Sequence, residues 1–269
     1  MTGTLIDDAV ELHPVEVDLL CSFAEVDAPF PLDVPSTGTT EIERRLIFQA
    51  AAEQLAARGL AGARGPVGVA RTFVRMLGSA TGTLYLVLAV GERSLGAVVL
   101  VDGMHALLAI QSPDEGGHLV RMTELTVDDA VRALLSLVPT VDAAAVPSFT
   151  MPLQPVHRVF DLLRQTRTAL SDTDIDALLW ECGIDETTAR RMTSLQPVTG
   201  SGQCGATVRG RGWQQTGAET RWIDTPRGRF ALASNTGPDG SAWANVHPLS
   251  RNDLRAAIRT LATQVREAT

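Results

Sequence analysis

Short segments of apolar or alternating apolar and polar residues, separated by turn residues, dominate two regions of the chain. Such segments predict β-strands, and the connections rich in Gly, Asp and Ser between them predict tight turns. The first region predicts four strands, at residues 83–90, 95–101, 104–110 and 118–124. The second region predicts four more, at residues 203–210, 219–224, 229–234 and 242–247. The pattern therefore predicts two antiparallel meanders.

Helical periodicity accounts for much of the remaining chain. The first helix that the pattern indicates runs over 40–58, because Thr40 and Glu43 form a capping box and Arg58-Gly59 supplies a stop after an apolar stripe. The segment 142–155 is rich in Ala, Pro and Ser and predicts a linker. Further helices are predicted at residues 67–77, 127–138, 156–170, 172–181, 186–195 and 252–266.

The second half of the chain repeats the order of the first. Gly103–Leu108 aligns with Gly228–Ala233 at a separation of 125 residues, and Leu125–Asp129 aligns with Leu249–Asp253 at a separation of 124. The one-residue difference falls in a turn, where a deletion is tolerated. We therefore predict an internally duplicated α+β fold with one central antiparallel sheet and quasi-two-fold symmetry. An N-terminal half (1–141) and a C-terminal half (142–269) are expected to form one integrated domain.

Composition narrows the class of protein. Among 269 residues, 45% are hydrophobic and 20% charged, which is ordinary for a globular chain. The chain has no lysine, and 31 acids against 23 arginines give a net charge of −8, which argues against a nucleic-acid partner. Apolar runs such as Ala97–Val101 are too short to span a membrane, and the N-terminus lacks the pattern of a signal peptide. A cytoplasmic protein with no membrane insertion is expected.

Motifs that carry chemistry are sparse. The three cysteines (Cys21, Cys182, Cys204) lie far apart, and the five histidines show no metal-ligand spacing. Gly200–Gly205 reads GxGxxG, but a helix precedes it and a strand follows, the reverse of a dinucleotide site, so a loop entering a strand is predicted. Asp224–Arg229 predicts a tight turn in which Asp224 bonds backbone amides. The sequence thus predicts no enzyme, no metal site and no cofactor.

Four segments occur in an order that resembles a known family. They are Pro29–Leu32, Leu55–Leu60, Asp224–Phe230 and Trp243–Pro248. Together they make the chain, from about residue 10 to 265, similar to the EspG proteins of actinobacterial type VII (ESX) secretion. The resemblance implies a central antiparallel sheet with flanking helical bundles. It also implies a cytosolic, non-enzymatic chaperone that binds the hydrophobic helical tip of a PPE protein in a PE–PPE heterodimer and keeps it soluble for secretion.

The resemblance also indicates two client-binding surfaces. One is a hairpin loop of the sheet, here Gly91, Glu92, Arg93 and Ser94. The other is the strand after the Gly200 loop, beside the helices of residues 172–196, with Gln203, Cys204, Ala206, Val208 and Arg209 as candidates. A broad, shallow apolar surface would fit the chaperone. An enclosed apolar cavity would favour the alternative, a duplicated α+β protein that binds a small ligand or regulates, and a deep pocket of titrating groups would favour an enzyme. A homodimer in the absence of client stays open.

Overall fold

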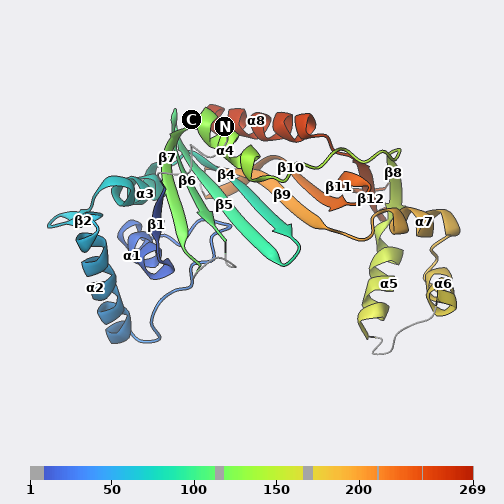
Figure 1. The fold of residues 1–269 in the computed structure, drawn as a ribbon, viewed down its shortest axis with the longest axis horizontal. Helices are drawn as coiled ribbons and strands as arrows, with labels where there is room; N and C mark the ends of the chain where they lie inside the picture. The colour runs from blue at the N-terminus through green and yellow to red at the C-terminus, as the bar shows by residue number, and fades with distance from the viewer. Residues whose placement is uncertain (1–8, 113–117, 166–171, 211, 238, 269) are drawn as a thin grey trace. The chain divides into compact units, whose positions relative to one another are not determined.

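The structure is a computed structural model that describes residues 9–112, 118–165, 172–210, 212–237 and 239–268. The strands of its main sheet are β1 (Val10–Leu12), β4 (Gly82–Val90), β5 (Arg93–Asp102), β6 (His105–Gln111), β7 (Val120–Thr126), β8 (Phe149–Pro152), β9 (Gly200–Arg209), β10 (Trp213–Thr225), β11 (Gly228–Thr236) and β12 (Ala242–Pro248). Within the described residues they form a ten-stranded antiparallel sheet in the order β1-β7-β6-β5-β4-β9-β10-β11-β12-β8 (Figure 1). A small separate hairpin pairs β2 (Ala61–Gly62) with β3 (Gly65–Pro66).

The helices of the described chain are α1 (Pro14–Ala24), α2 (Glu41–Ala57), α3 (Gly68–Ser79), α4 (Val127–Leu137), α5 (Leu153–Gln165), α6 (Asp172–Glu181), α7 (Glu186–Ser194) and α8 (Arg251–Glu267). The predicted α+β class and its antiparallel sheet are confirmed. Part of the helix predicted over 156–170 lies outside the described residues. No helix in the described ranges is both long and apolar enough to cross a membrane.

The first meander follows the predicted pattern closely. β4 and β5 pair from Gly82–Val101 to Val90–Arg93, and β5 and β6 pair from Gly96–Gln111 to Asp102–His105. Gly91 and Gly103 occupy the two turns at φ +60°, a conformation that residues with a Cβ rarely adopt. In the second meander the prediction for Gly200–Gly205 was wrong, because this segment is already part of β9.

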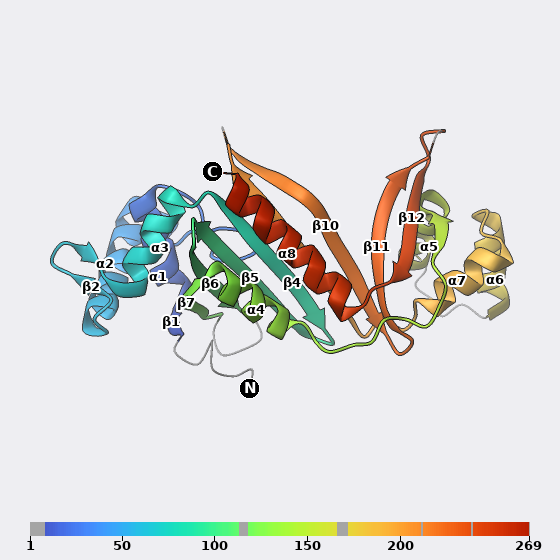
Figure 2. The same ribbon diagram turned by 90° about the horizontal axis from the view of Figure 1, so that it is seen from above.

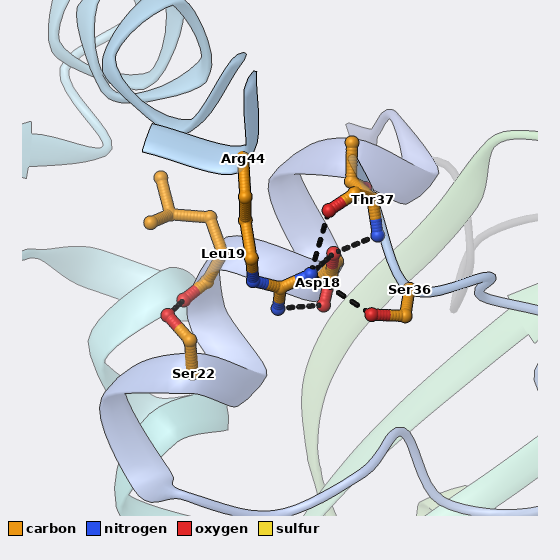
Figure 3. A network of polar contacts seen from close by, with 6 residues as sticks. All are labelled: Asp18, Leu19, Ser22, Ser36, Thr37 and Arg44. Carbon is orange, nitrogen blue, oxygen red and sulfur yellow. Dashed lines mark hydrogen bonds and ion pairs between the residues drawn. The ribbon is translucent and has the colours of Figure 1, made fainter. Parts of the chain in front are cut away.

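Two elements near the N-terminus were not predicted. β1 pairs with β7, and α1 begins at Pro14 with His13 as its cap and Glu16 completing a capping box. The Asp18 carboxylate of α1 accepts both terminal nitrogens of Arg44 at 3.0 and 2.9 Å, and the Thr37 backbone N–H at 2.7 Å (Figure 3). This network holds the segment before α2 against α1.

Contacts between residues divide the chain into two compact units. Unit 1 comprises residues 1–139, 202–219 and 255–269. In this unit α3 packs on the sheet beside α1, while α4 and the end of α8 cover the opposite face of the strands (Figures 1 and 2). Its core is built from apolar side chains of α1, α3 and strands β5–β7, with Phe73 fully buried.

Unit 2 comprises residues 140–201 and 220–254. The segment predicted as a linker contains β8, which pairs with β12, and the first residues of α5. The turn between β10 and β11 also differs from expectation. Asp224 does not bond turn amides; it accepts two hydrogen bonds from the side chain of Arg229, at 2.7 and 2.9 Å. Within the turn, the Thr225 hydroxyl accepts the Arg227 backbone N–H at 3.1 Å.

Candidate functional site

The predicted hairpin candidates are all exposed. Gly91, Glu92, Arg93 and Ser94 form the tip of β4–β5, and the strands pair as far as Val90 and Arg93. The tip is therefore a two-residue turn, and the area that it can offer to a partner is small. The Ser94 carbonyl accepts the Ser112 hydroxyl at 3.0 Å, which ties the tip to the end of β6.

Side chains alternate along a strand, so Cys204, Ala206 and Val208 of β9 lie on one face, and Gln203 and Arg209 lie on the other. Cys204 and Ala206 are buried, at 2% and 0% exposure, so their side chains cannot contact a partner in this structure. Gln203, Val208 and Arg209 are half-buried. Of the predicted set, these three and the hairpin tip remain available for binding.

Gln203 belongs to a polar network on the face of the sheet that Tyr85 occupies. The Tyr85 hydroxyl donates to Glu219 Oε2 at 2.6 Å, and Gln203 Nε2 donates to the same oxygen at 2.8 Å. Burial, and then the neighbouring Glu219 carboxylate, raise the pKa of Tyr85 to about 12. Tyr85 is consequently a neutral donor at physiological pH, and the network fixes its ring over Gly205, where a Cβ would lie 2.5 Å from Cζ.

A cavity of about 460 Å³ opens beside this network. Its floor includes Thr83 of β4 and Thr207 of β9, whose hydroxyls hydrogen-bond to each other at 2.8 Å. The rim carries Val26, Phe30 and Trp213, three apolar side chains that are exposed in the described chain. The hollow is thus apolar, with a few hydroxyl groups at its base.

Trp213 is held in place by Arg209, one of the predicted candidates. The Arg209 guanidinium stacks 4.7 Å from the centre of the Trp213 ring and donates to the carbonyls of Leu77 and Gly78 at the end of α3. A cation is favourable at the carboxyl end of a helix, where backbone carbonyls lack helical partners. Arg209 therefore joins β9, β10 and α3 around one side of the cavity, which its place in the sequence did not indicate.

In unit 2, Trp180 is an exposed residue that was not among the predicted candidates. This residue lies on α6 and its side chain is 81% exposed. Ile175 on the same helix and Leu162 on α5 are also exposed. A tryptophan that is almost fully exposed is typical of a binding hot spot, since it offers a large contact area with little conformational freedom to lose. The sequence contains a signal for this exposure, because Trp180 falls outside the apolar stripe of the helix Asp172–Glu181.

Comparison with protein-family models decides to which family this chain belongs. The model of the EspG family matches residues 13–260, which is most of the chain. The chain belongs to the EspG family. The resemblance inferred from the four ordered segments is thereby confirmed, and the family match includes both units.

The fold of this EspG-family protein has a counterpart among solved structures. It is similar to the Mycobacterium tuberculosis type VII secretion system chaperone EspG5, solved in complex with the PE25–PPE41 dimer, with a TM-score of 0.62. The two chains share 12% identity over 94% of this chain and 95% of EspG5. Comparison with curated protein sequences gives no match. The structural likeness at this identity establishes a shared fold.

Two observations concern the metal-binding and nucleophilic groups of this EspG-family chain. No set of three or more His, Cys, Asp or Glu residues in the described ranges could hold a metal ion. Burial raises the pKa of the Cys21 thiol to about 12, with further contributions from the Asp18 and Asp27 carboxylates. A thiol with so high a pKa carries little thiolate at neutral pH and is a poor nucleophile.

The shifted pKa of Cys21 predicts a specific loss of stability in alkali. The thiol ionises near pH 9 when unfolded and near pH 12 when folded, so its stabilising contribution is complete below pH 9 and is lost as the pH rises toward 12. The slope is at most about 1.4 kcal/mol per pH unit. Urea denaturation at pH 8 and pH 10 should show a smaller pH-dependent loss for Cys21→Ala than for the wild type. Equal losses in the two proteins would contradict the shift.

Proposed function

We propose that this chain is a non-enzymatic chaperone of type VII secretion that acts in the cytoplasm and binds a PE–PPE dimer through its PPE subunit. The observation that carries the proposal is the EspG family match over residues 13–260. A shared fold with EspG5, which was solved with the PE25–PPE41 dimer, supports it. By covering an apolar client tip, the chaperone lowers the concentration of unprotected client by mass action.

Two client-binding surfaces are assigned, one in each unit, at positions that are exposed or half-buried. In unit 1 these are the tip Gly91, Glu92, Arg93 and Ser94, and the half-buried Gln203, Val208 and Arg209 of β9. In unit 2 the helical bundle contributes Trp180, whose exposure suits an anchor in a hydrophobic contact. Trp180 is expected to dominate the affinity, because central aromatic anchors contribute more than residues of a polar rim.

We also infer that the two meanders are copies of one ancestral unit. The cap of α4 supports this, because Asp129 N–H donates to Thr126 Oγ1 and Asp253 N–H donates to Ser250 Oγ in the same way, 124 residues later. The two meanders also follow the same order of elements, four strands and then a helix, in β4–β7 with α4 and in β9–β12 with α8.

Co-expression with PE–PPE pairs encoded in the same genome tests the chaperone function. We expect a stable complex on size exclusion and client solubility that depends on this chain. Trp180→Ala should weaken binding about thirtyfold, since an anchor of this kind contributes about 2 kcal/mol. The matched control is Ile42→Ala, which removes an exposed apolar side chain from a different helix, α2. This variant should bind the PE–PPE dimer as the wild type does.

These measurements test the chaperone function and the role of Trp180 separately. Absence of a complex with every plausible pair, while the chain itself is folded and monodisperse, would refute the chaperone function. A complex that forms equally well with Trp180→Ala would leave the function intact and remove Trp180 from the surface.

A further inference from the structure

The cavity of unit 1 has walls that are fixed before any partner arrives. The Phe30 ring meets Tyr85 edge to face, with centroids 5.2 Å apart and planes at 81°, and Tyr85 is in turn held by Glu219. On another side Arg209 holds Trp213. Preorganised walls favour binding because little side-chain freedom is lost when a ligand enters.

The rim of the cavity is apolar and exposed to solvent. Phe30 is 61% exposed, and Val26 and Trp213 are also exposed. A pocket for a small molecule usually buries most of its ligand, whereas exposed aromatic side chains around an open hollow are typical of contacts with another protein. With a volume of about 460 Å³, the hollow has room for apolar side chains from one face of a helix.

The charge on the Val26 side of the rim is negative, opposite in sign to the Arg209 guanidinium at Trp213. Among the described residues that line the cavity, Asp27 is the only charged one, and it is exposed. Exposed Glu25 lies two residues earlier, so acidic groups flank Val26 on both sides. The Asp27 carboxylate is close enough to Cys21 to raise the pKa of that thiol, which indicates a negative potential along this segment. A positively charged group on the partner complements such a rim.

We propose that this cavity receives two apolar side chains, spaced three or four residues apart on a helix of the PE–PPE client, with a neighbouring Arg or Lys of that helix placed against Asp27. The proposal rests on the proposed function and adds to it a contact outside the hairpin tip, β9 and the C-terminal bundle. The cavity combines an apolar pocket with one acidic residue at its rim. It therefore favours clients that carry a positive charge next to the two apolar side chains that enter it.

Photocrosslinking on the full complex tests this contact directly. The photoreactive amino acid p-benzoylphenylalanine replaces Phe30, whose aromatic character it keeps, and replaces Ile42 on α2 in a control. After irradiation of the complex with a PE–PPE dimer, we expect a crosslink to a helix of the client from position 30 and none from position 42. Sequencing of the crosslinked peptide should reveal a basic residue within one helical turn.

Affinity measurements supply a second readout. Asp27→Arg should weaken binding of the PE–PPE dimer about tenfold, and reversing the charge of the crosslinked client residue should restore it. Glu267→Arg makes the same charge change at an exposed position near the end of α8 and should leave affinity unchanged. A complex that forms without the crosslink, with Asp27→Arg binding as the wild type does, overturns the cavity proposal alone. Failure of the wild type to form a complex overturns the proposed function and this contact together.

Discussion

Replacing Asp224 by alanine is expected to lower the free energy of unfolding by about 3–5 kcal/mol, because it removes the carboxylate that pairs with a buried arginine. Arg229 is 1% exposed, and its Nε and Nη2 donate to the two carboxylate oxygens of Asp224 at 2.7 and 2.9 Å. Neither group can reach water without a local opening of unit 2. Urea denaturation, followed by circular dichroism, measures the loss.

The surroundings of this pair explain why relaxation is difficult. The Arg229 guanidinium lies 5.5 Å from the centre of the buried Trp222 ring. Its backbone is also fixed, since its N–H donates to the Asp142 carbonyl and its carbonyl accepts the N–H groups of Ala144 and Leu249. The side chain therefore remains in the core after the carboxylate is removed, and the desolvated charge has to be accommodated there.

Two further variants distinguish the buried charge from a general effect on the turn. Arg227→Ala changes an exposed arginine of the same turn and should alter stability by less than about 0.5 kcal/mol. The double variant Asp224→Leu with Arg229→Met removes both charges and should recover most of the loss, as apolar replacements of buried ion pairs often do. A large loss in the double variant would show that packing, not charge, accounts for the result.

The sequence predicted elements whose signals are local. The helix expected over 40–58 is α2. The Thr40 hydroxyl accepts the Glu43 N–H at 3.2 Å, which is one half of the predicted capping box, while the Glu43 carboxylate accepts the N–H of Thr39 at 2.9 Å. The strands of the first meander were recognisable because they combine apolar runs with turn residues such as Gly91 and Gly103. In each case the decisive contact joins residues that are close in sequence, so pattern alone identifies it.

The helix α1 escaped prediction because its stability depends on distant residues. Most of its surface is buried, so its sequence lacks the polar face that marks an amphipathic helix. Its two buried acids, Glu16 and Asp18, are paired with Arg58 and Arg44 from the ends of α2. Ion pairs across 26 and 42 residues leave no signature in a sequence pattern, and without them these carboxylates would not be buried.

The candidate site was predicted less completely than the fold. The family resemblance indicated the β9 strand, but Cys204 and Ala206, in the middle of this strand, are buried in the core. The cavity beside Tyr85 joins residues from α3, β4, β5, β9, β10 and the segment after α1, an assembly that depends on the tertiary fold. Trp180 was visible in the sequence, but its exposure follows from how α6 packs in unit 2.

Gly205→Val is expected to destabilise the chain by about 3 kcal/mol, because a side chain at this position occupies the space of the Tyr85 ring. A Cβ added to Gly205 would lie 2.5 Å from Tyr85 Cζ and 3.0 Å from Cε1. The ring cannot move aside freely, since its hydroxyl donates to Glu219 and its edge contacts Phe30. Gly210→Ala is the control, because the nearest atom to its added Cβ is 3.8 Å away.

A double-mutant cycle tests whether the loss of stability in Gly205→Val comes from the Tyr85 ring. Once Tyr85 is replaced by alanine, Gly205→Val should cost less than about 1 kcal/mol, so the two effects should fall well short of additivity in chemical denaturation. Full additivity would mean that the valine disturbs the pairing of β4 with β9 instead. Because Tyr85 also forms a wall of the cavity, displacement of its ring should weaken client binding. Reduced affinity at a temperature where Gly205→Val is fully folded would therefore connect this packing contact to the proposed docking site.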